Sequence, residues 1–306
     1  MKILSIIIII LLIVYLLASY ILFLLVSRKF CPKLSKHLDE KVGIELKKYQ
    51  DIIEEGQDWV QSQKVKHIFI KYKKNPKIHA IYINNPKSDK IMILSHGYRS
   101  TAFRDVYPSC HEYYKMGFSL LIIDQRTSNK SEGKYITYGY KEKIDLLLWI
   151  NYLSKKYKNK KIILAGVSMG ATTSLLATEL TDKVTGVIAD SGYINAYEEI
   201  DYTLNKFYKI PTRILMPAIN LWNKLINGFD YKDVDTKKAL ENTRIPILFV
   251  HGRSDIFIPM KNSIENYDKY KGEKMLLTIP KANHGMSYLL DKDKYIQTLK
   301  EYLKLI

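Results

Sequence analysis

The 306-residue chain contains only two cysteines, Cys31 and Cys110. Two cysteines exclude a framework of several disulfides, and their separation does not match a metal-ligand spacing. No group of histidines and carboxylates has such a spacing either, so we expect no metal and no cofactor. The chain also lacks the G-x-G-x-x-G and Walker-type loops that cradle phosphates, which excludes the common nucleotide-binding classes.

Acidic residues are scarce relative to basic ones. The chain has 31 Asp and Glu against 48 Lys and Arg, giving a formal net charge of +17. The lysines are dispersed rather than gathered into one stripe, which argues against a nucleic-acid partner and favours a general lysine bias. Attraction of a basic surface to anionic lipid headgroups is the alternative interpretation.

Charge is absent from residues 3–26, and apolar residues continue through this segment. At about 1.5 Å per residue it is long enough to cross a bilayer core of about 30 Å. A cleaved signal peptide has a shorter apolar region that ends in a small-x-small site, and this run continues past Ala18-Ser19-Tyr20 to Val26. We therefore expect residues 1–27 to be an uncleaved transmembrane anchor (a signal-anchor in the cell membrane), with the side of the membrane left open.

The remaining chain suits a polar stalk at 28–60, with apolar residues at helix-like spacing, followed by one domain at 61–306. A hairpin opens the domain, and strand-like and helix-like segments then alternate. Such alternation predicts a mostly parallel sheet flanked by helices.

An interval too long for a loop, residues 192–241, interrupts the pattern after the sixth strand. Its apolar residues recur at helical spacing, so we expect a small helical cap. The predicted strands are 67–72, 78–83, 91–95, 119–123, 161–165, 184–189, 246–250 and 274–279; the predicted helices are 107–116, 138–157, 262–270 and 291–305, together with one after Ser168.

The pentapeptide Gly166-Val167-Ser168-Met169-Gly170 joins a predicted strand to a predicted helix. In this context G-x-S-x-G is the pattern of a tight turn that exposes a nucleophilic serine. By itself it also describes a plain glycine-lined turn. The assignment of Ser168 as a nucleophile therefore depends on an acid and a histidine that follow in the chain.

Both candidates are present, each just past a predicted strand: Asp255 after 246–250 and His284 after 274–279. A serine hydroxyl needs a base such as histidine, and a carboxylate on the far ring nitrogen orients that base. Asp190 also ends a strand and is the alternative acid. We favour Asp255 because the strand that precedes the histidine-bearing strand is the usual source.

The tetrahedral intermediate of such chemistry needs backbone donors for its oxyanion. We expect the amides of Met169 and Tyr98 to supply them, the second from the loop Ser95-His96-Gly97-Tyr98. For the other polar residues at strand ends we expect structural roles. These are His96, His251, Asp124 and Arg126.

With these motifs the chain resembles the α/β-hydrolase superfamily, and most of all the bacterial, cap-bearing serine hydrolases grouped with serine aminopeptidases and small esterases. The resemblance runs from about residue 65 to the C-terminus. It departs where similar proteins have a glycine after the Asp-x-Arg arginine, because Thr127-Ser128-Asn129 stands there. The matching segments are Leu94 to Tyr98, Asp124 to Arg126 with Ser131 to Gly133, Gly166 to Gly170, His251 to Asp255 with Ile258-Pro259, and Asn283 to Gly285.

The sequence thus predicts a membrane-anchored serine hydrolase of the carboxylesterase class that acts on a small-molecule ester. The apolar cap and the anchor favour an ester with an apolar acyl group. The resemblance also admits a serine aminopeptidase, which would need an anion for the substrate amine. Glu198, Glu199 and Asp201 lie in the cap, although such a cluster is more typical of a solvated helix face. A non-catalytic, membrane-tethered binding scaffold is the third hypothesis.

Overall fold

The computed structural model describes residues 2–28 and 46–306. Much of the predicted stalk therefore lies outside the described residues. Its described part is a short 3-10 turn, η1 (Leu46–Tyr49), and the helix α3 (Gln50–Ser62). The Trp59 ring of α3 stacks on His111 at a centroid separation of 5.0 Å, so α3 packs on the body of the protein.

An eight-stranded sheet forms the centre of the molecule, in the order β1-β2-β4-β3-β5-β6-β7-β8. The first two strands form the predicted hairpin and pair antiparallel, and β3 to β8 are parallel. The prediction of a mostly parallel sheet flanked by helices is confirmed. The strands are β1 (Val65–Ile70), β2 (Ile78–Ile83), β3 (Lys90–Ser95), β4 (Phe118–Asp124), β5 (Lys161–Val167), β6 (Val184–Asp190), β7 (Ile247–Gly252) and β8 (Lys274–Ile279).

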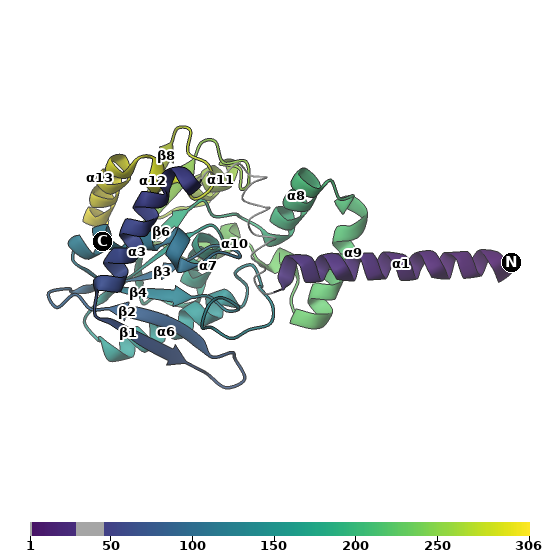
Figure 1. The fold of residues 1–306 in the computed structure, drawn as a ribbon, viewed down its shortest axis with the longest axis horizontal. Coiled ribbons are helices and arrows are strands. Elements are labelled where there is room, and N and C mark those ends of the chain that lie inside the picture. Colours follow the sequence, from purple (N-terminus) through teal and green to yellow (C-terminus); the bar gives the residue numbers. More distant parts are fainter. Residues whose placement is uncertain (1, 29–45) are drawn as a thin grey trace.

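Helices cover both faces of the sheet because the central strands are apolar on both sides and bury nearly every residue (Figure 1). Alternate residues of each strand point to opposite faces, and two separate hydrophobic cores result. One core lies under α3, α4 (Ala102–Asp105), α5 (Tyr107–Lys115), α12 (Ser287–Leu290) and α13 (Lys292–Tyr302). The other lies under α6 (Glu142–Lys156), α7 (Met169–Ala177), α10 (Thr236–Glu241) and α11 (Lys261–Lys269).

The helix predicted at 138–157 begins four residues later, at Glu142. Tyr138 has φ 54° and Gly139 has φ 99°, and neither conformation continues a right-handed helix. The residues before Glu142 form a turn instead. This turn matters for the site, because the Tyr138 side chain lines the pocket beside Ser168.

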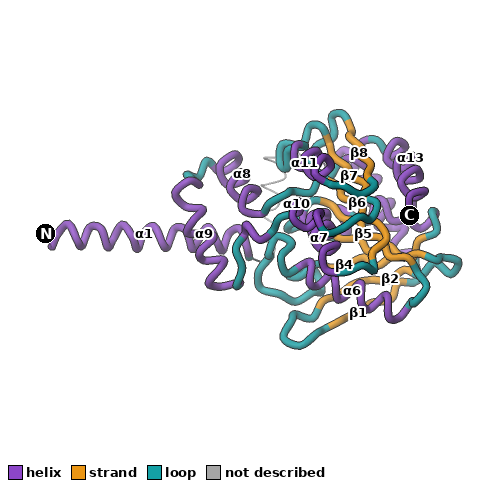
Figure 2. Tube along the Cα trace, turned by 180° about the vertical axis from the view of Figure 1, so that it is seen from behind, coloured by secondary structure: helices purple, strands orange, loops and turns teal. Residues whose placement is uncertain are grey.

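The interval after β6 contains α8 (Ala196–Tyr208), α9 (Thr212–Asn227), η3 (Tyr231–Asp233) and α10. A third hydrophobic core lies among these helices, the turn around Tyr138 and the end of the N-terminal helix α1 (Lys2–Ser27). Figure 2, seen from behind, shows α8 and α9 on the same side of the sheet as α1.

Among the described residues, α1 is the one helix long and apolar enough to cross a membrane. Its N-terminal part extends away from the rest of the molecule (Figure 1), whereas Phe23 and Ser27 are fully buried at its other end. Ile136 donates its backbone N–H to the Ser27 carbonyl at 2.7 Å. The last turns of α1 are thus part of the folded body.

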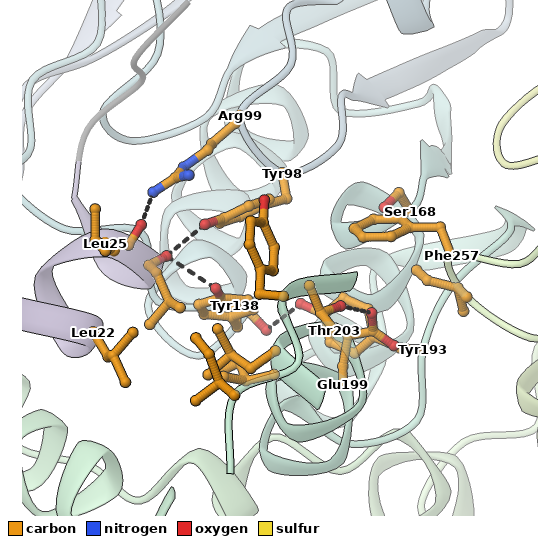
Figure 3. Close-up of a pocket in the computed structure, with 16 residues that line it drawn as sticks. Leu22, Leu25, Tyr98, Arg99, Tyr138, Ser168, Tyr193, Glu199, Thr203 and Phe257 are labelled. Atoms are coloured by element: carbon orange, nitrogen blue, oxygen red, sulfur yellow. Dashed lines mark hydrogen bonds between the residues drawn. The ribbon is translucent and has the colours of Figure 1, made fainter. Parts of the chain in front are cut away.

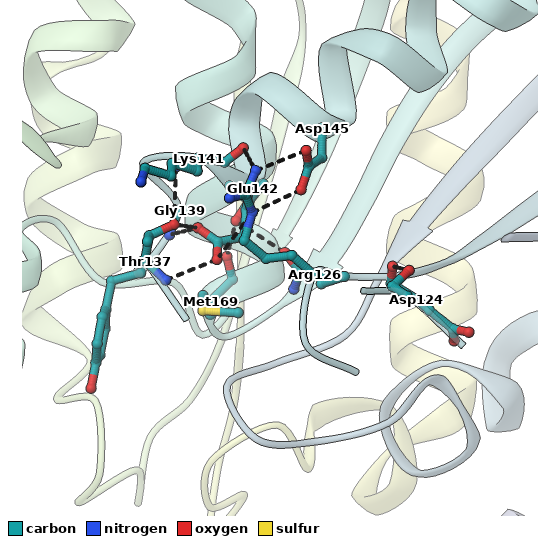
Figure 4. A network of polar contacts seen from close by, with 12 residues as sticks. Asp124, Arg126, Thr137, Gly139, Lys141, Glu142, Asp145 and Met169 are labelled. Atoms are coloured by element: carbon teal, nitrogen blue, oxygen red, sulfur yellow. Dashed lines mark hydrogen bonds and ion pairs between the residues drawn. The ribbon is translucent and has the colours of Figure 1, made fainter. Parts of the chain in front are cut away.

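A buried polar network fixes the long loop between β4 and α6 (Figure 4). The Arg126 guanidinium makes two 2.8 Å hydrogen bonds to the Asp145 carboxylate and a third, at 3.0 Å, to the Lys141 carbonyl. Glu142 accepts from the backbone of Thr137 at 2.9 Å and from its hydroxyl at 2.6 Å. The expectation that Arg126 serves structure agrees with these contacts.

The segment that departs from the glycine-containing family pattern still makes its turn. Thr127 has φ 71° and Asn129 has φ 42°, both in the left-handed region. Asn129 tolerates this conformation because its short polar side chain bonds locally, here to Asp124 Oδ2 at 2.9 Å. Asp124 also pairs with His79 at 2.6 Å, so it too has a structural role.

Replacing Arg126 by methionine should lower the free energy of unfolding by about 3–5 kcal/mol, because it leaves the buried Asp145 and Glu142 carboxylates without their cation. Urea denaturation measures the loss. The control is Lys237→Met, which breaks the more exposed Lys237–Glu265 pair and should cost less than about 1 kcal/mol. Equal losses in both variants would contradict this account of the network.

Candidate active site

Ser168 stands on a sharp turn between β5 and α7, with φ 58° and ψ −121°. A non-glycine residue rarely adopts such angles, and strain of this kind is typical of a functional turn. The backbone is packed too closely for side chains on either side. A Cβ on Gly170 would lie 2.2 Å from the Ser95 carbonyl oxygen, and one on Gly166 would lie 2.3 Å from the Gly170 carbonyl. The two glycines of the motif are therefore required by the packing.

Asp255 lies in the turn after β7, accepts three hydrogen bonds and lies close to a second imidazole. Its Oδ1 accepts from the backbone N–H groups of Phe257 at 2.9 Å and Ile258 at 2.8 Å. Its Oδ2 lies 2.8 Å from His284 Nδ1 and 3.2 Å from His251 Nε2. These contacts join the predicted acid to the predicted base.

Burial alone would raise the pKa of Asp255, but the neighbouring charge of His284 and the hydrogen bonds from both imidazoles outweigh it and lower the pKa to about 2. The carboxylate is therefore ionised at neutral pH. Asp190, the alternative acid, is different: burial raises its pKa, and its hydrogen-bond partners are the Ser191 and Ser287 hydroxyls rather than His284. The geometry thus favours Asp255 over Asp190.

His284 follows β8 and packs its ring edge-on against Phe257, at a centroid separation of 4.9 Å. A Cβ on the adjacent Gly285 would lie 3.2 Å from Val167 Cγ1, so the histidine segment contacts the residue before Ser168. The hydrogen bonds of the described residues do not include one between Ser168 and His284. Such bonds are often long in structures without substrate and tighten when substrate binds.

The loop after β3 lies directly against Ser168. A Cβ on Gly97 would lie 3.1 Å from the Ser168 Cβ, and the Gly97 N–H donates to the Asp105 carboxylate at 2.8 Å. No hydrogen bond between described residues uses the backbone amides of Tyr98 or Met169. Met169 follows Ser168 in the chain and Tyr98 follows the Gly97 that contacts it, so both amides remain predicted oxyanion donors.

Two histidines near the site support it without facing the serine. His96 is buried, which lowers its pKa, and its Nε2 accepts from the Gln125 N–H at 3.1 Å. This contact agrees with the expected structural role. A structural role at its strand end was expected for His251, and that expectation did not include its contact with Asp255. Burial lowers the pKa of His251, but its bonds to Asp255 and Ile258 outweigh burial and raise it.

A pocket of about 740 Å³, including space open to solvent, extends from Ser168. It is lined almost entirely by apolar and aromatic side chains from α1, α8 and the loops around Tyr98 and Tyr138 (Figure 3). Figure 3 places Ser168 and Phe257 at one end and Leu22 and Leu25 of α1 at the other. A mainly apolar lining with a few polar groups is typical of sites that hold small apolar ligands.

Among the residues that the structure describes, Glu199 is the one acidic residue that lines this pocket. It is buried, and its Oε1 accepts from the Thr203 hydroxyl at 3.0 Å. Burial raises its pKa well above the ordinary value. The neighbouring Glu198 is exposed, so the solvated helix face expected for this cluster describes Glu198 but not Glu199.

No pattern in the sequence distinguished the other groups at the pocket. Arg99 and Tyr138 both have positive φ and both line it, yet neither lies in a recognised motif. Leu22 and Leu25 belong to a uniformly apolar run. Their places follow from how α1 docks, which local sequence does not specify.

Lowering the pH should destabilise the protein partly through Asp255. Its pKa falls from about 3.9 in an unfolded chain to about 2, so its contribution of about 2 kcal/mol is present above pH 4 and is lost as the pH falls towards 2. Asp255→Asn should therefore lose less stability than the wild type between pH 5 and pH 3. Thermal unfolding across that range measures the difference, and parallel losses would contradict the assignment.

Comparison with known proteins agrees with this geometry. Residues 86–228 match the family model described as "Serine aminopeptidase, S33". YqkD, an uncharacterised protein of Bacillus subtilis, is 31% identical over 196 residues, which cover 63% of this chain and 64% of that protein. The Pyrococcus furiosus esterase Pf2001 superposes with a TM-score of 0.66 at 25% identity, over 80% of this chain and 94% of the esterase. An acylaminoacyl peptidase of Pyrococcus horikoshii superposes with a TM-score of 0.60 at 15% identity, over 81% of this chain and 42% of the peptidase chain. The fold, the family match and these neighbours show that the chain has the α/β-hydrolase fold.

Proposed function

We propose that the protein is a serine hydrolase that cleaves carboxylic esters through an acyl-enzyme on Ser168 and is held in the membrane by α1. The observation that supports the proposal most is the occurrence together of a strained serine turn, a bonded acid–histidine pair and an apolar pocket. Ser168 stands on a strained turn, His284 is bonded to the ionised Asp255 beside it, and an apolar cavity opens from the serine.

The chemistry follows from these groups. The Ser168 Oγ attacks the ester carbonyl while His284 Nε2 takes its proton, and Asp255 stabilises the resulting imidazolium. The oxyanion accepts hydrogen bonds from the Met169 and Tyr98 amides, each worth about 3–4 kcal/mol in the transition state. His284 then returns the proton to the leaving alcohol. Water attacks the acyl-enzyme by the same route in reverse, which releases the acid and regenerates Ser168.

The lining of the pocket supports an apolar acyl group as the substrate. Ile200, Leu204 and Ile258 contribute buried aliphatic surface, and Phe257 lies between this surface and His284. Each methylene that leaves water contributes about 0.8 kcal/mol. An ester with a longer acyl chain therefore gains binding energy in this cavity until the chain fills it.

A fluorophosphonate probe should label the wild-type protein and should not label Ser168→Ala, because the probe phosphonylates an activated serine. Gel fluorescence measures the label. Ser174→Ala, on the same helix but bonded to the Gly170 carbonyl, is the control and should be labelled like the wild type. Equal labelling of the wild type and Ser168→Ala would refute the nucleophile.

Hydrolysis of p-nitrophenyl esters should become more efficient as the acyl chain lengthens from acetate, with kcat/KM rising about threefold to fourfold for each added methylene. Initial rates under matched conditions provide the measurement. A strict preference for acetate would contradict the apolar pocket as the acyl site.

Glu199 supports a second candidate function, the hydrolysis of an aminoacyl substrate whose α-amine pairs with a carboxylate in the pocket. Its raised pKa argues against this candidate, because a neutral carboxyl attracts an ammonium group weakly. Glu199→Gln keeps the shape of the side chain and decides between the two. An aminopeptidase would lose turnover of aminoacyl-p-nitroanilides, and an esterase would keep its activity on simple esters.

A non-catalytic scaffold is the third hypothesis, and it requires a His284 that is turned away from the site. The observed His284 is bonded to Asp255 and packed against a residue of the pocket wall. This placement supports catalysis rather than a purely binding role.

A further inference from the structure

The C-terminal end of α1 is bonded to the same loops that surround Ser168. The Val26 carbonyl accepts from the hydroxyls of Tyr98, at 2.6 Å, and Tyr138, at 2.9 Å. The Leu25 carbonyl accepts from the Arg99 guanidinium, and Figure 3 shows the three bonds together. The last carbonyls of a helix have no partners within the helix, so these bonds fix the end of α1. They also connect it to the loop whose Tyr98 amide we assign to the oxyanion.

The same end of α1 forms one wall of the pocket. Leu22 and Leu25 lie at the end of the cavity opposite Ser168 (Figure 3), and Ile200 and Leu204 of α8 line it as well. An acyl chain on Ser168 that extends along this cavity therefore reaches the surface of α1.

The cap helix α9 lies alongside α1 over its middle part. Tyr15 of α1 donates its hydroxyl to the Ile214 carbonyl at 2.9 Å, and the Trp222 indole donates to the Ser19 hydroxyl at 3.1 Å. The rings of Tyr20 and Trp222 are 5.0 Å apart. From Tyr15 onwards, α1 is thus accompanied by the cap.

The free part of α1 is too short to cross a bilayer by itself. Residues 3–14 precede the first contact with α9 and span about 18 Å at 1.5 Å per residue, whereas the hydrocarbon core is about 30 Å thick. The apolar run of α1 continues through the part that α9 accompanies, so an α1 that spans the membrane along this run takes that part into the apolar layer. The outer surface of α9 would then lie within the apolar layer or at its edge.

The outer surface of α9 has the composition for such a place. Ile214, Leu221 and Leu225 are exposed by 63%, 49% and 68%. The polar residues Asn223 and Asn227 are buried instead, with Asn223 donating to the Phe229 carbonyl at 2.7 Å and Asn227 donating to Asn223 at 2.9 Å. Because Met216 and Ile219 are buried on its inner side, α9 carries large apolar side chains on both its buried and its exposed surface, where they lie together with Arg213 and Lys224.

We propose that α9 and the docked half of α1 seat the cap in the surface of the bilayer, and that the pocket takes its acyl chain from a membrane amphiphile, a lipid ester, along Leu22 and Leu25. This inference rests on the proposed ester hydrolysis and on α1 as the membrane span. It makes α1 a wall of the substrate site as well as an anchor. A lipid tail is the occupant that matches both the apolar surface of α9 and the apolar lining of the cavity.

The depth of α9 can be measured with Trp222 as a native probe, in the full-length protein reconstituted into phosphatidylcholine and phosphatidylglycerol vesicles. Lipids brominated on the acyl chain should quench tryptophan fluorescence in the wild type and in Trp59→Phe, and the quenched fraction should disappear in Trp222→Phe. Trp59 lies on α3, away from the cap, and is the matched control. Equal quenching in the wild type and Trp222→Phe would overturn the membrane placement. This readout does not depend on catalysis, so it separates the inference from the proposed function.

The pocket wall is tested by Leu22→Trp, which fills the end of the cavity, against Leu12→Trp on the free part of α1 as the control. Leu22→Trp should lower the ratio of kcat/KM for a long-chain ester to kcat/KM for p-nitrophenyl acetate by about tenfold or more, because the indole occupies the space of the distal part of the chain. Leu12→Trp should behave like the wild type. An unchanged chain-length profile in a labelled, active Leu22→Trp protein would refute α1 as the acyl wall, whereas absent labelling in the wild type would refute the serine hydrolase itself.

Discussion

The close packing of three backbone segments around Ser168 is the constraint on which the site depends. The end of β3, the turn after β5 and the start of α7 approach so closely that a single methyl group on Gly170 would collide with the Ser95 carbonyl. This packing holds Ser168 at a positive φ and presses the Gly97 loop against it. The serine and the loop that carries the Tyr98 amide are therefore positioned by the core of the sheet, before any side-chain chemistry is considered.

Electrostatics completes the arrangement around a single carboxylate. Asp255 receives two backbone N–H groups on one oxygen and two imidazoles on the other, and this saturation keeps it charged in a buried position. A charge without such partners would be costly to bury. Asp190, which lacks comparable donors, has its pKa raised by burial and is poorly suited to stabilise an imidazolium. The contrast shows why one of two similar strand-end aspartates suits the role of acid.

The sheet and the approximate positions of Ser168, Asp255 and His284 were predictable because each depends on local patterns: strand periodicity, turn glycines and strand ends. The start of α6 was not, since Tyr138 adopts a left-handed conformation that its residue type does not favour, in a turn whose Thr137 and Gly139 N–H groups bond to Glu142. The contact of His251 with Asp255 escaped notice because it depends on how the turn folds back. The lining by Leu22 and Leu25 was also hidden, because exposed and pocket-facing leucines look alike in an apolar run. Glu199 is buried only through the way α8 packs.

An apolar N-terminal helix, a helical cap and a serine on a strained turn meet at one pocket. The central claim of the proposed function is that the acyl group passes through a covalent bond to Ser168. Acid quenching during turnover of a p-nitrophenyl ester, followed by digestion and mass spectrometry, tests that claim most directly. The account predicts an acyl adduct on Ser168, within the tryptic peptide of residues 162–183. Sustained ester turnover with the adduct absent from that peptide, or present only on another residue, would contradict it.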